Sequence, residues 1–428
     1  MYHPLRVKCG GRVVLPPTDA THFPSRNAAS HRPRDMLPKF YVGDVKLAPG
    51  EVAPVSYEAD MQPGGFQHAL RSRVDAHFRD TGRDPRVHPH MFVKTAAILA
   101  GYVLCWYSTF FAPLPGLFAQ LALAVLLGVF KAEVGVSIMH DANHGAYSAS
   151  PLLGRLAGAT LDACGASSFL WKQQHVAAHH VHTNVDGLDP DIRVGESDPY
   201  RATRTQPLHP WHVHQHLYAP LVYCLLAAKN IYNDDFETLR SGKIAGRTIA
   251  KLRTADKAQL AAGKAFYFFY WLIAPAVWGR LGWGALLLRW VVSYAATGWT
   301  LALMFQVAHV VESVSFPTVD AATRVVASPK GWAAAQLSST ADFAPDSFFW
   351  LHFSGGLNHQ SIHHLFPGVC HVHYPDIAKI VKRTAAEFGV PYNVYPSFTA
   401  ALRSHLRHLK AMGEQGKPFE MPSMASLG

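Results

Sequence analysis

The most informative residues of this 428-residue chain are its histidines, because many of the 26 stand in tight groups. The first box is His140-Asp-Ala-Asn-His144, and the second box is His175-Val-Ala-Ala-His179-His180. Residues i and i+4 share one face of a helix, so both imidazoles of such a pair can reach one metal-sized point. Each box is therefore a candidate set of metal ligands.

A third box and one isolated histidine complete the set. The third box is Gln360-Ser-Ile-His363-His364, with the glutamine one helical turn before the histidine pair. His309 stands at the end of an apolar run, and an ionisable residue in or near a membrane span is a functional candidate by default. One His-x-x-x-His pair is more often two solvated side chains than a metal site. Three boxes together indicate a metal centre.

Eight clustered histidines exceed the about four to six ligands of one metal ion, so two metals with open positions fit the count. Imidazole suits iron, copper, nickel and zinc. The five cysteines are scattered without a Cys-x-x-Cys pair, which argues against a zinc finger and a disulfide framework. Two nitrogen-ligated irons could bind dioxygen, accept two electrons and form an oxidant that removes hydrogen from an unactivated C–H bond.

Other histidines carry weaker signals. Two that adjoin the boxes, His182 and His359, are left open with a structural role favoured. The remaining histidines outside the boxes are interpreted as structural or surface residues: His209, His212, His214, His216, His371 and His373.

Two long stretches, 95–130 and 290–311, contain no Asp, Glu, Lys or Arg. A bilayer core of about 30 Å needs roughly 20 apolar residues in a helix, so both stretches can span it. Pro113, Pro115 and Gly116 divide the first stretch into two helices, the second of which continues into the first box. The expected spans are about 94–112, 116–137, 265–283 and 286–309.

These spans predict an all-α integral membrane protein with four transmembrane helices in two hairpins. Both termini and the long polar segment 172–264 then lie on one side, where Lys and Arg are abundant, and this side is cytosolic by the positive-inside rule. All the boxes lie there, so a cytosolic helical cap is expected to hold the di-iron histidine cluster. Arg280 and Arg289, at the second hairpin turn, are expected to reach the far interface.

The net charge of +10 fits a cytosolic face better than a nucleic-acid partner, because the basic residues flank apolar spans and are interrupted by acids.

Residues 1–65 are expected to form a disordered polar arm. An organellar transit peptide at the start of this arm is the weaker alternative. Residues 66–84 predict an amphipathic helix near the membrane surface. Residues 66–392 are expected to form the catalytic domain, and 393–428 a basic tail.

The boxes HDANH, HVAAHH and QSIHH at these separations resemble those of membrane fatty acid desaturases, and the resemblance covers about 66–392. Gln360, where most relatives have histidine, resembles the front-end desaturases, which place a double bond between the carboxyl end and an existing double bond. The segments TGRDPR, TNVDGLDPD and LNHQSIHHLFPGVCHVHYP also resemble that subfamily. Ile362 departs from it, because front-end relatives usually have an acid there.

The resemblance implies a non-haem di-iron centre that uses dioxygen to put a cis double bond into a polyunsaturated acyl chain. Gln360 would take the place of a further ligand, directly or through water. Asp141, Asn143 and Glu312 are expected to orient the imidazole rings. The residues that the resemblance implies as iron ligands are His140, His144, His175, His179, His180, His309, His363 and His364.

The expected electron donor follows from a haem-binding motif that the sequence lacks. Many front-end relatives carry a fused cytochrome b5 domain with an HPGG motif, whereas this chain has only Gln62-Pro-Gly-Gly65, interpreted as a turn. Electrons are therefore expected from a separate cytochrome b5 in the endoplasmic reticulum, the favoured location, or from ferredoxin in a plastid. The acyl substrate is carried on coenzyme A or on a glycerolipid.

Two other functions remain open from the sequence. A di-iron fatty acyl or lipid hydroxylase is the first, since the same oxidant can return oxygen to the substrate. A histidine-rich membrane metal transporter is the remote second. A transporter is expected to place polar residues at mid-membrane in broken helices, whereas here the spans are apolar and the histidines gather at one face.

Overall fold

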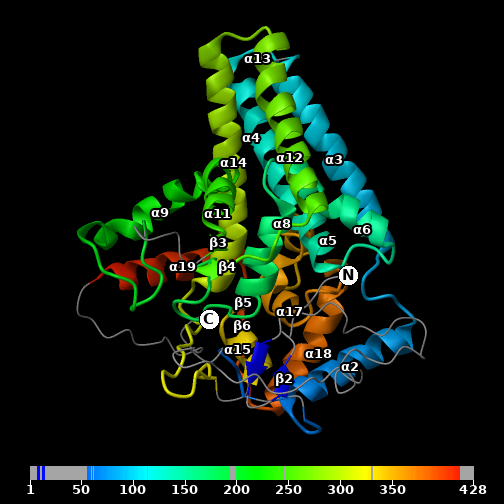
Figure 1. Ribbon diagram of the computed structural model, residues 1–428, viewed down its shortest axis with the longest axis vertical. Helices are drawn as coiled ribbons and strands as arrows, with labels where there is room; N and C mark the ends of the chain where they lie inside the picture. The colour runs from blue at the N-terminus through cyan, green and yellow to red at the C-terminus, as the bar shows by residue number, and fades with distance from the viewer. Residues whose placement is uncertain are drawn as a thin grey trace.

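The computed structural model describes residues 7–9, 12–14, 55–58, 60, 62–112, 114–192, 199–244, 246–328 and 331–414. Most of the expected polar arm (1–65) and the end of the expected basic tail lie outside these residues. Within the arm, strands β1 (Val7–Cys9) and β2 (Arg12–Val14) pair in antiparallel fashion. The described part of the chain is mostly helical, as the sequence predicts (Figure 1).

Four helices are long and apolar enough to cross a membrane, which is the predicted number. They stand side by side and form the upper part of the molecule in Figure 1. In three of them the apolar run determines both ends within a few residues of the expected bounds. The spans are α3 (Pro89–Phe110); α4 (Leu117–Glu133) continued by η3 (Val134–Met139) and α5 (His140–His144); α12 (Thr254–Phe268) continued by η7 (Phe269–Ile273) and α13 (Ala274–Trp278); and α14 (Trp283–His309).

The third span begins earlier than expected, at Thr254 rather than near 265. The uncharged run of this span begins only after Lys264, so the sequence alone predicts a start near 265. In the structure this lysine is buried, and its Nζ donates to the carboxylate of Asp235 at 2.7 Å. A partner 29 residues away in the sequence therefore satisfies a charge that would otherwise end the helix.

The two arginines at the second hairpin turn differ from each other. Arg280 is exposed, as a residue at an interface would be. Arg289 is buried instead of reaching outward, and its guanidinium donates to the side chain of Gln120 in α4 and to the backbone oxygen of Ala285. An acceptor on the neighbouring helix thus holds Arg289 inside the bundle.

Helices α4 and α14 pack closely because small residues line their contact. Thr297 of α14 donates its hydroxyl to the backbone oxygen of Gly128, and Ser293 donates to that of Ala124, both at 3.0 Å. Small residues let helix backbones approach, and their hydroxyls join helices across the contact. These two helices carry the first box and His309 at their lower ends.

Shorter elements form a base that lies below the bundle and, at α9 and α11, beside its lower half in Figure 1. Its strands are β3 (Lys243–Ile244) antiparallel to β4 (Arg247–Thr248), and β5 (Ala341–Phe343) parallel to β6 (Asn393–Tyr395). Its helical elements, with η for π or 3-10 segments, are α2 (Phe66–Thr81), α6 (Pro151–Gly158), α7 (Thr160–Ala163), α8 (Ser168–Trp171), η4 (Lys172–His179), η5 (Pro210–His214), α9 (Gln215–Tyr223), α10 (Leu226–Lys229), η6 (Asn230–Asp234), α11 (Asp235–Ser241), α15 (Gly331–Ser338), α16 (Phe348–Phe353), η8 (Leu357–His359), α17 (Gln360–Leu365), η9 (His371–His373), α18 (Tyr374–Glu387) and α19 (Phe398–Gly413).

The predicted amphipathic helix is present as α2, but its apolar face packs on protein. Phe66, Leu70, Val74 and Phe78 recur at four-residue spacing and are buried in one cluster with residues of α15 and α18. The apolar face that the sequence suggested for the membrane surface is thus covered by the base. Apolar periodicity alone cannot distinguish a lipid surface from a protein surface.

Residues 393–414 of the expected tail belong to the base rather than to a separate segment. Strand β6 completes a sheet with β5, and α19 buries Ala401 and Leu409 in the same cluster as Val310 and Val314. Its basic residues lie on the opposite face, which is why the sequence resembles a solvated tail.

The close contact of α4 and α14 predicts that Gly128→Ala destabilises the bundle. A Cβ at this position would lie 2.4 Å from the backbone oxygen of Ser293, so the helices would have to separate. We expect a loss of about 1–3 kcal/mol, measured as a lower Tm of the protein in detergent. Gly154→Ala in α6 is the control, since a Cβ there meets nothing within 4 Å. Equal Tm values for the two variants would contradict this packing.

Candidate metal centre

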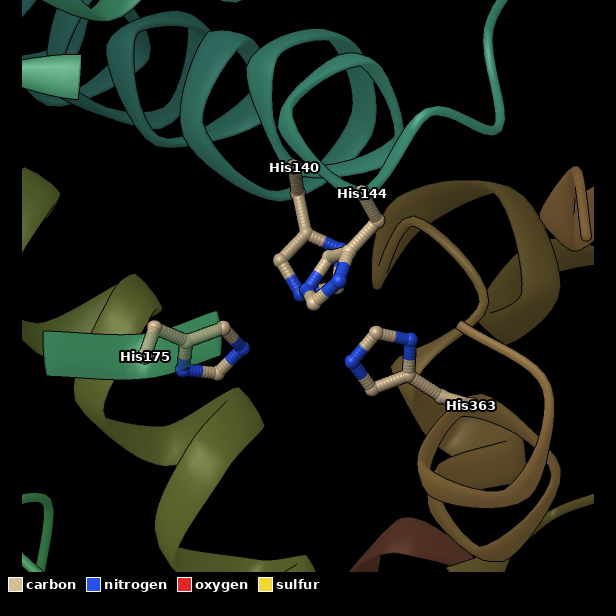
Figure 2. Close-up of side chains that lie close together, drawn as sticks. All are labelled: His140, His144, His175 and His363. Atoms are coloured by element: carbon tan, nitrogen blue, oxygen red, sulfur yellow. The ribbon is translucent and has the colours of Figure 1, made fainter. Parts of the chain in front are cut away.

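Four box histidines converge on one point. The ligand atoms of His140, His144, His175 and His363 all lie within 4.8 Å of one another, and all four side chains are buried. Figure 2 shows the rings directed toward a common centre. The first two come from α5, the third from η4 and the fourth from α17. We name these residues the four-histidine group.

A second group adjoins the first. His179, His309 and His364 also have ligand atoms within 4.8 Å of one another, and we name them the three-histidine group. The amide nitrogen of Gln360 lies 2.8 Å from Nε2 of His309.

His180 lies between the two groups. Its Nε2 is 3.2 Å from Nε2 of His175 and 3.0 Å from Nε2 of His363, and its ring stacks on that of His364 at 4.2 Å between centroids. Every histidine that the sequence analysis placed at the metal centre is therefore in this one buried cluster.

Wide helical turns explain how the second box faces the cluster with all its histidines. Residues 172–179 form the π-helical segment η4, and the backbone N–H of His180 donates to the oxygen of His175, five residues earlier, at 3.0 Å. A turn closed over five residues places both the fourth and the fifth residue above the first. A second π segment, η3, directly precedes His140. Such segments often occur at functional sites.

Carboxylates hold two of the rings from outside. Nδ1 of His179 lies 2.9 Å from Asp189, and Nδ1 of His175 lies 3.0 Å from Asp191. Asp189 is itself fixed by the backbone N–H of Asn184 at 2.7 Å. Both acids belong to the segment TNVDGLDPD, whose pattern alone does not predict that they contact the box histidines.

The third box is held in the same way by neutral groups. Nδ1 of His363 lies 3.2 Å from the hydroxyl of Tyr374, and Nδ1 of His364 lies 2.9 Å from Oε1 of Gln336 and 3.0 Å from the hydroxyl of Thr183. Gln336 and Thr183 are distant from the third box in the sequence, so no local pattern could identify them. Outer partners of this kind set the orientation of a ring and the nitrogen that it offers.

Several imidazole nitrogens in the cluster are available to bind a metal. Among the described residues, Nε2 of His144, of His179 and of His364 is buried without a hydrogen-bond partner. A buried polar atom without a partner is costly, and a metal ion would satisfy all of these lone pairs. The set of imidazole nitrogens therefore fits a pair of nitrogen-ligated metal ions such as iron.

Burial also sets the protonation of the rings. It lowers the pKa of His363 and that of His364 well below the ordinary value, and neighbouring histidines add to the shift. Both rings are then neutral, the form that binds a metal. Burial also acts to lower the pKa of His179, but Asp189 and Asp191 outweigh it and raise that pKa. The two acids thus make the imidazole of His179 a more basic ligand.

Three expected ring-orienting residues have other partners. Asp141 accepts a hydrogen bond from Nδ1 of His371 at 2.7 Å, and its other oxygen is 4.0 Å from the nearest nitrogen of His140. Asn143 donates to the backbone oxygen of Gly158, and Glu312 pairs with Arg407 at 2.8 Å. Adjacency in the sequence does not decide which group each of these side chains contacts, because folding brings in the partners from elsewhere in the chain.

Of the histidines left open, His359 is buried but lies in neither group, and neither of its ring nitrogens has a hydrogen-bond partner among the described residues. The ring of His182 stacks on Tyr57. His371, interpreted as structural, contacts Asp141 and Lys94.

The sequence is similar to those of known proteins over most of its length. The model of the family described as fatty acid desaturase matches residues 116–396. The chain is 45% identical to an acyl-lipid (8-3)-desaturase of Physcomitrium patens, over 89% of this chain and 79% of that protein. It is 34% identical to an acyl-lipid (8-3)-desaturase of Mortierella alpina, over 95% of this chain and 88% of the relative. It is 36% identical to an sn-1 linoleoyl-lipid 6-desaturase of Synechocystis sp., over 82% of this chain and 97% of the relative.

These relatives are named as desaturases, which decides against the hydroxylase and the metal transporter. The matched residues include all three boxes and His309. Four apolar helices and the buried histidine cluster agree with a membrane enzyme of this kind. The chain belongs to the fatty acid desaturase family and is an integral membrane desaturase.

Proposed function

We propose that this chain is a front-end acyl-lipid desaturase with a di-iron centre in its histidine cluster. The observation that carries the proposal is the convergence of eight histidines, from four separate segments, into one buried cluster: the four-histidine group, the three-histidine group and His180 between them. The relatives' names support an acyl chain carried on a lipid as the substrate. Gln360 in the third box supports the front-end type by resemblance.

One iron would be held by the four-histidine group and the other by the three-histidine group, with His180 between them and Gln360 beside His309. When bound, the iron pair supplies the reduction of dioxygen and the removal of two hydrogens from adjacent carbons. The overall change is –CH2–CH2– + O2 + 2e− + 2H+ → –CH=CH– + 2H2O.

The chain's own residues prepare this reaction. Asp189 and Asp191 fix the rings of His179 and His175 before any metal binds, so little reorganisation is needed on binding. Burial of the cluster keeps bulk water from a strong oxidant. Because the first box ends a membrane helix, the cluster would lie close to the bilayer in which an acyl chain dissolves.

We further propose two transmembrane hairpins with the base in the cytosol, most consistent with the endoplasmic reticulum and with a plastid membrane as the alternative. The supporting facts are the four apolar helices and the abundance of Lys and Arg in the segments of the base. Residues 66–392, together with β6 and α19, would form one catalytic unit.

Loss of a single ligand should abolish turnover. His140→Ala, His179→Ala and His364→Ala each remove one nitrogen from the cluster, so we expect no desaturated product and less iron in the purified protein. Product is measured by fatty-acid analysis and iron by elemental analysis. His214→Ala, on the exposed surface of η5, is the control and should keep both. Substantial activity in any two of the three variants, or zinc alone in the active protein, would exclude the di-iron assignment.

The two electrons should come from a separate protein. No haem, flavin or nucleotide-binding motif is visible in the sequence. The Lys and Arg residues in the lower part of the molecule would attract an acidic electron carrier such as cytochrome b5 or ferredoxin. We expect turnover by the purified chain only when a reduced carrier is supplied, with a rate that falls as salt rises. Turnover with a reduced nicotinamide cofactor as the only addition would contradict this.

The new double bond should lie on the carboxyl side of an existing one. The test supplies unsaturated acids of about 18 to 22 carbons to cells that express the chain, a range taken from the resemblance, and locates the new bond by mass spectrometry. A bond added toward the methyl end, or efficient conversion of saturated chains, would remove the front-end assignment. The desaturase function would remain.

A further inference from the structure

One short turn after the third box contacts the first-box segment on one side and a histidine of the third box on the other. The ring of His371 is fully buried. Its Nδ1 lies 2.7 Å from Oδ2 of Asp141, and its backbone N–H donates to the same oxygen at 3.3 Å. Its other ring nitrogen lies 3.2 Å from Nζ of Lys94. Asp141 directly follows His140 of the first box, so this turn is hydrogen-bonded to the helix that carries the first box.

Three residues later the same turn reaches the third box. Tyr374, the first residue of α18, places its hydroxyl 3.2 Å from Nδ1 of His363. Gly356 packs closely against this turn, because a Cβ there would lie only 2.3 Å from the Cβ of His371. The turn thus contacts both Asp141, the neighbour of His140, and His363.

We infer that His371 is a positioning residue that sets the distance between the first and third boxes. The inference rests on the proposed di-iron function. His140 and His144 end a membrane helix, whereas His363 belongs to the base, and α5 and α17 need a link that fixes their separation. The Asp141 carboxylate is almost fully buried, so it must keep its hydrogen-bonding partner in one place. His371 supplies that partner.

Two substitutions separate the two contacts of the ring. His371→Asn keeps an N–H near the position of Nδ1, facing Asp141, and loses the contact with Lys94. His371→Gln extends toward Lys94 and loses the contact with Asp141. We expect the four-histidine group of the Gln variant to bind iron about 10–100-fold more weakly, and that of the Asn variant to stay close to wild type.

The experiment adds ferrous iron alone to the metal-free, full-length protein in detergent, without substrate or electron donor. Bound iron is counted, and electron paramagnetic resonance after oxidation distinguishes a coupled pair from a single ferric ion. We expect two irons in wild type and in His371→Asn, and about one, with the single-ion signal, in His371→Gln. Tyr374→Phe, which removes only the hydroxyl on His363, should shift affinity in the same direction.

His408→Gln is the matched control. His408 is also buried, and its Nε2 lies 2.8 Å from the backbone oxygen of Ala202, away from the boxes. Two irons with the coupled signal in His371→Gln would overturn the inference, and so would an equal loss of iron in His408→Gln. Wild-type protein that binds no iron would instead remove the proposed di-iron function.

Discussion

The structure depends on one constraint: eight imidazoles must be buried together, neutral, with their lone pairs directed inward. Burial, with a further contribution from neighbouring histidines, lowers the pKa of His363 and of His364 and so favours neutral rings. It does not choose which nitrogen faces the centre. That choice is made by partners outside the cluster, which take up Nδ1 of His175, His179 and His364 through hydrogen bonds. The cluster is therefore organised by groups that would never touch a metal.

The same constraint links the membrane helices to the base. The first box and His309 end two helices of the bundle, whereas the second and third boxes lie in the base. The close contact of α4 and α14 fixes the first two contributions relative to each other. The carboxylate of Asp141 and the amide of Asn184, which donates to the backbone oxygen of His309 at 2.7 Å, attach both helix ends to the base.

The sequence was informative wherever the signal was local. Histidines spaced by four residues and long uncharged runs predicted the boxes and the four membrane helices. The errors arose where a distant partner changes the meaning of a residue: Lys264 with Asp235, and Arg289 with Gln120. The pattern of α2 predicts an amphipathic helix near the membrane surface, but periodicity carries no information about what covers the apolar face, which packs on protein. Gln336 and Thr183 could not be found, because only folding brings them to His364.

The two histidine groups are chemically unequal. The four-histidine group offers imidazole nitrogens alone, whereas the three-histidine group has the amide of Gln360 against His309. An amide is a poorer ligand than imidazole, so a metal in the second group would be less firmly held and would have a more open coordination shell. The carboxylates compensate on that side, because Asp189 makes His179 the more basic ligand. The asymmetry is built from this chain's own residues, so the two groups would hold a metal ion with unequal strength.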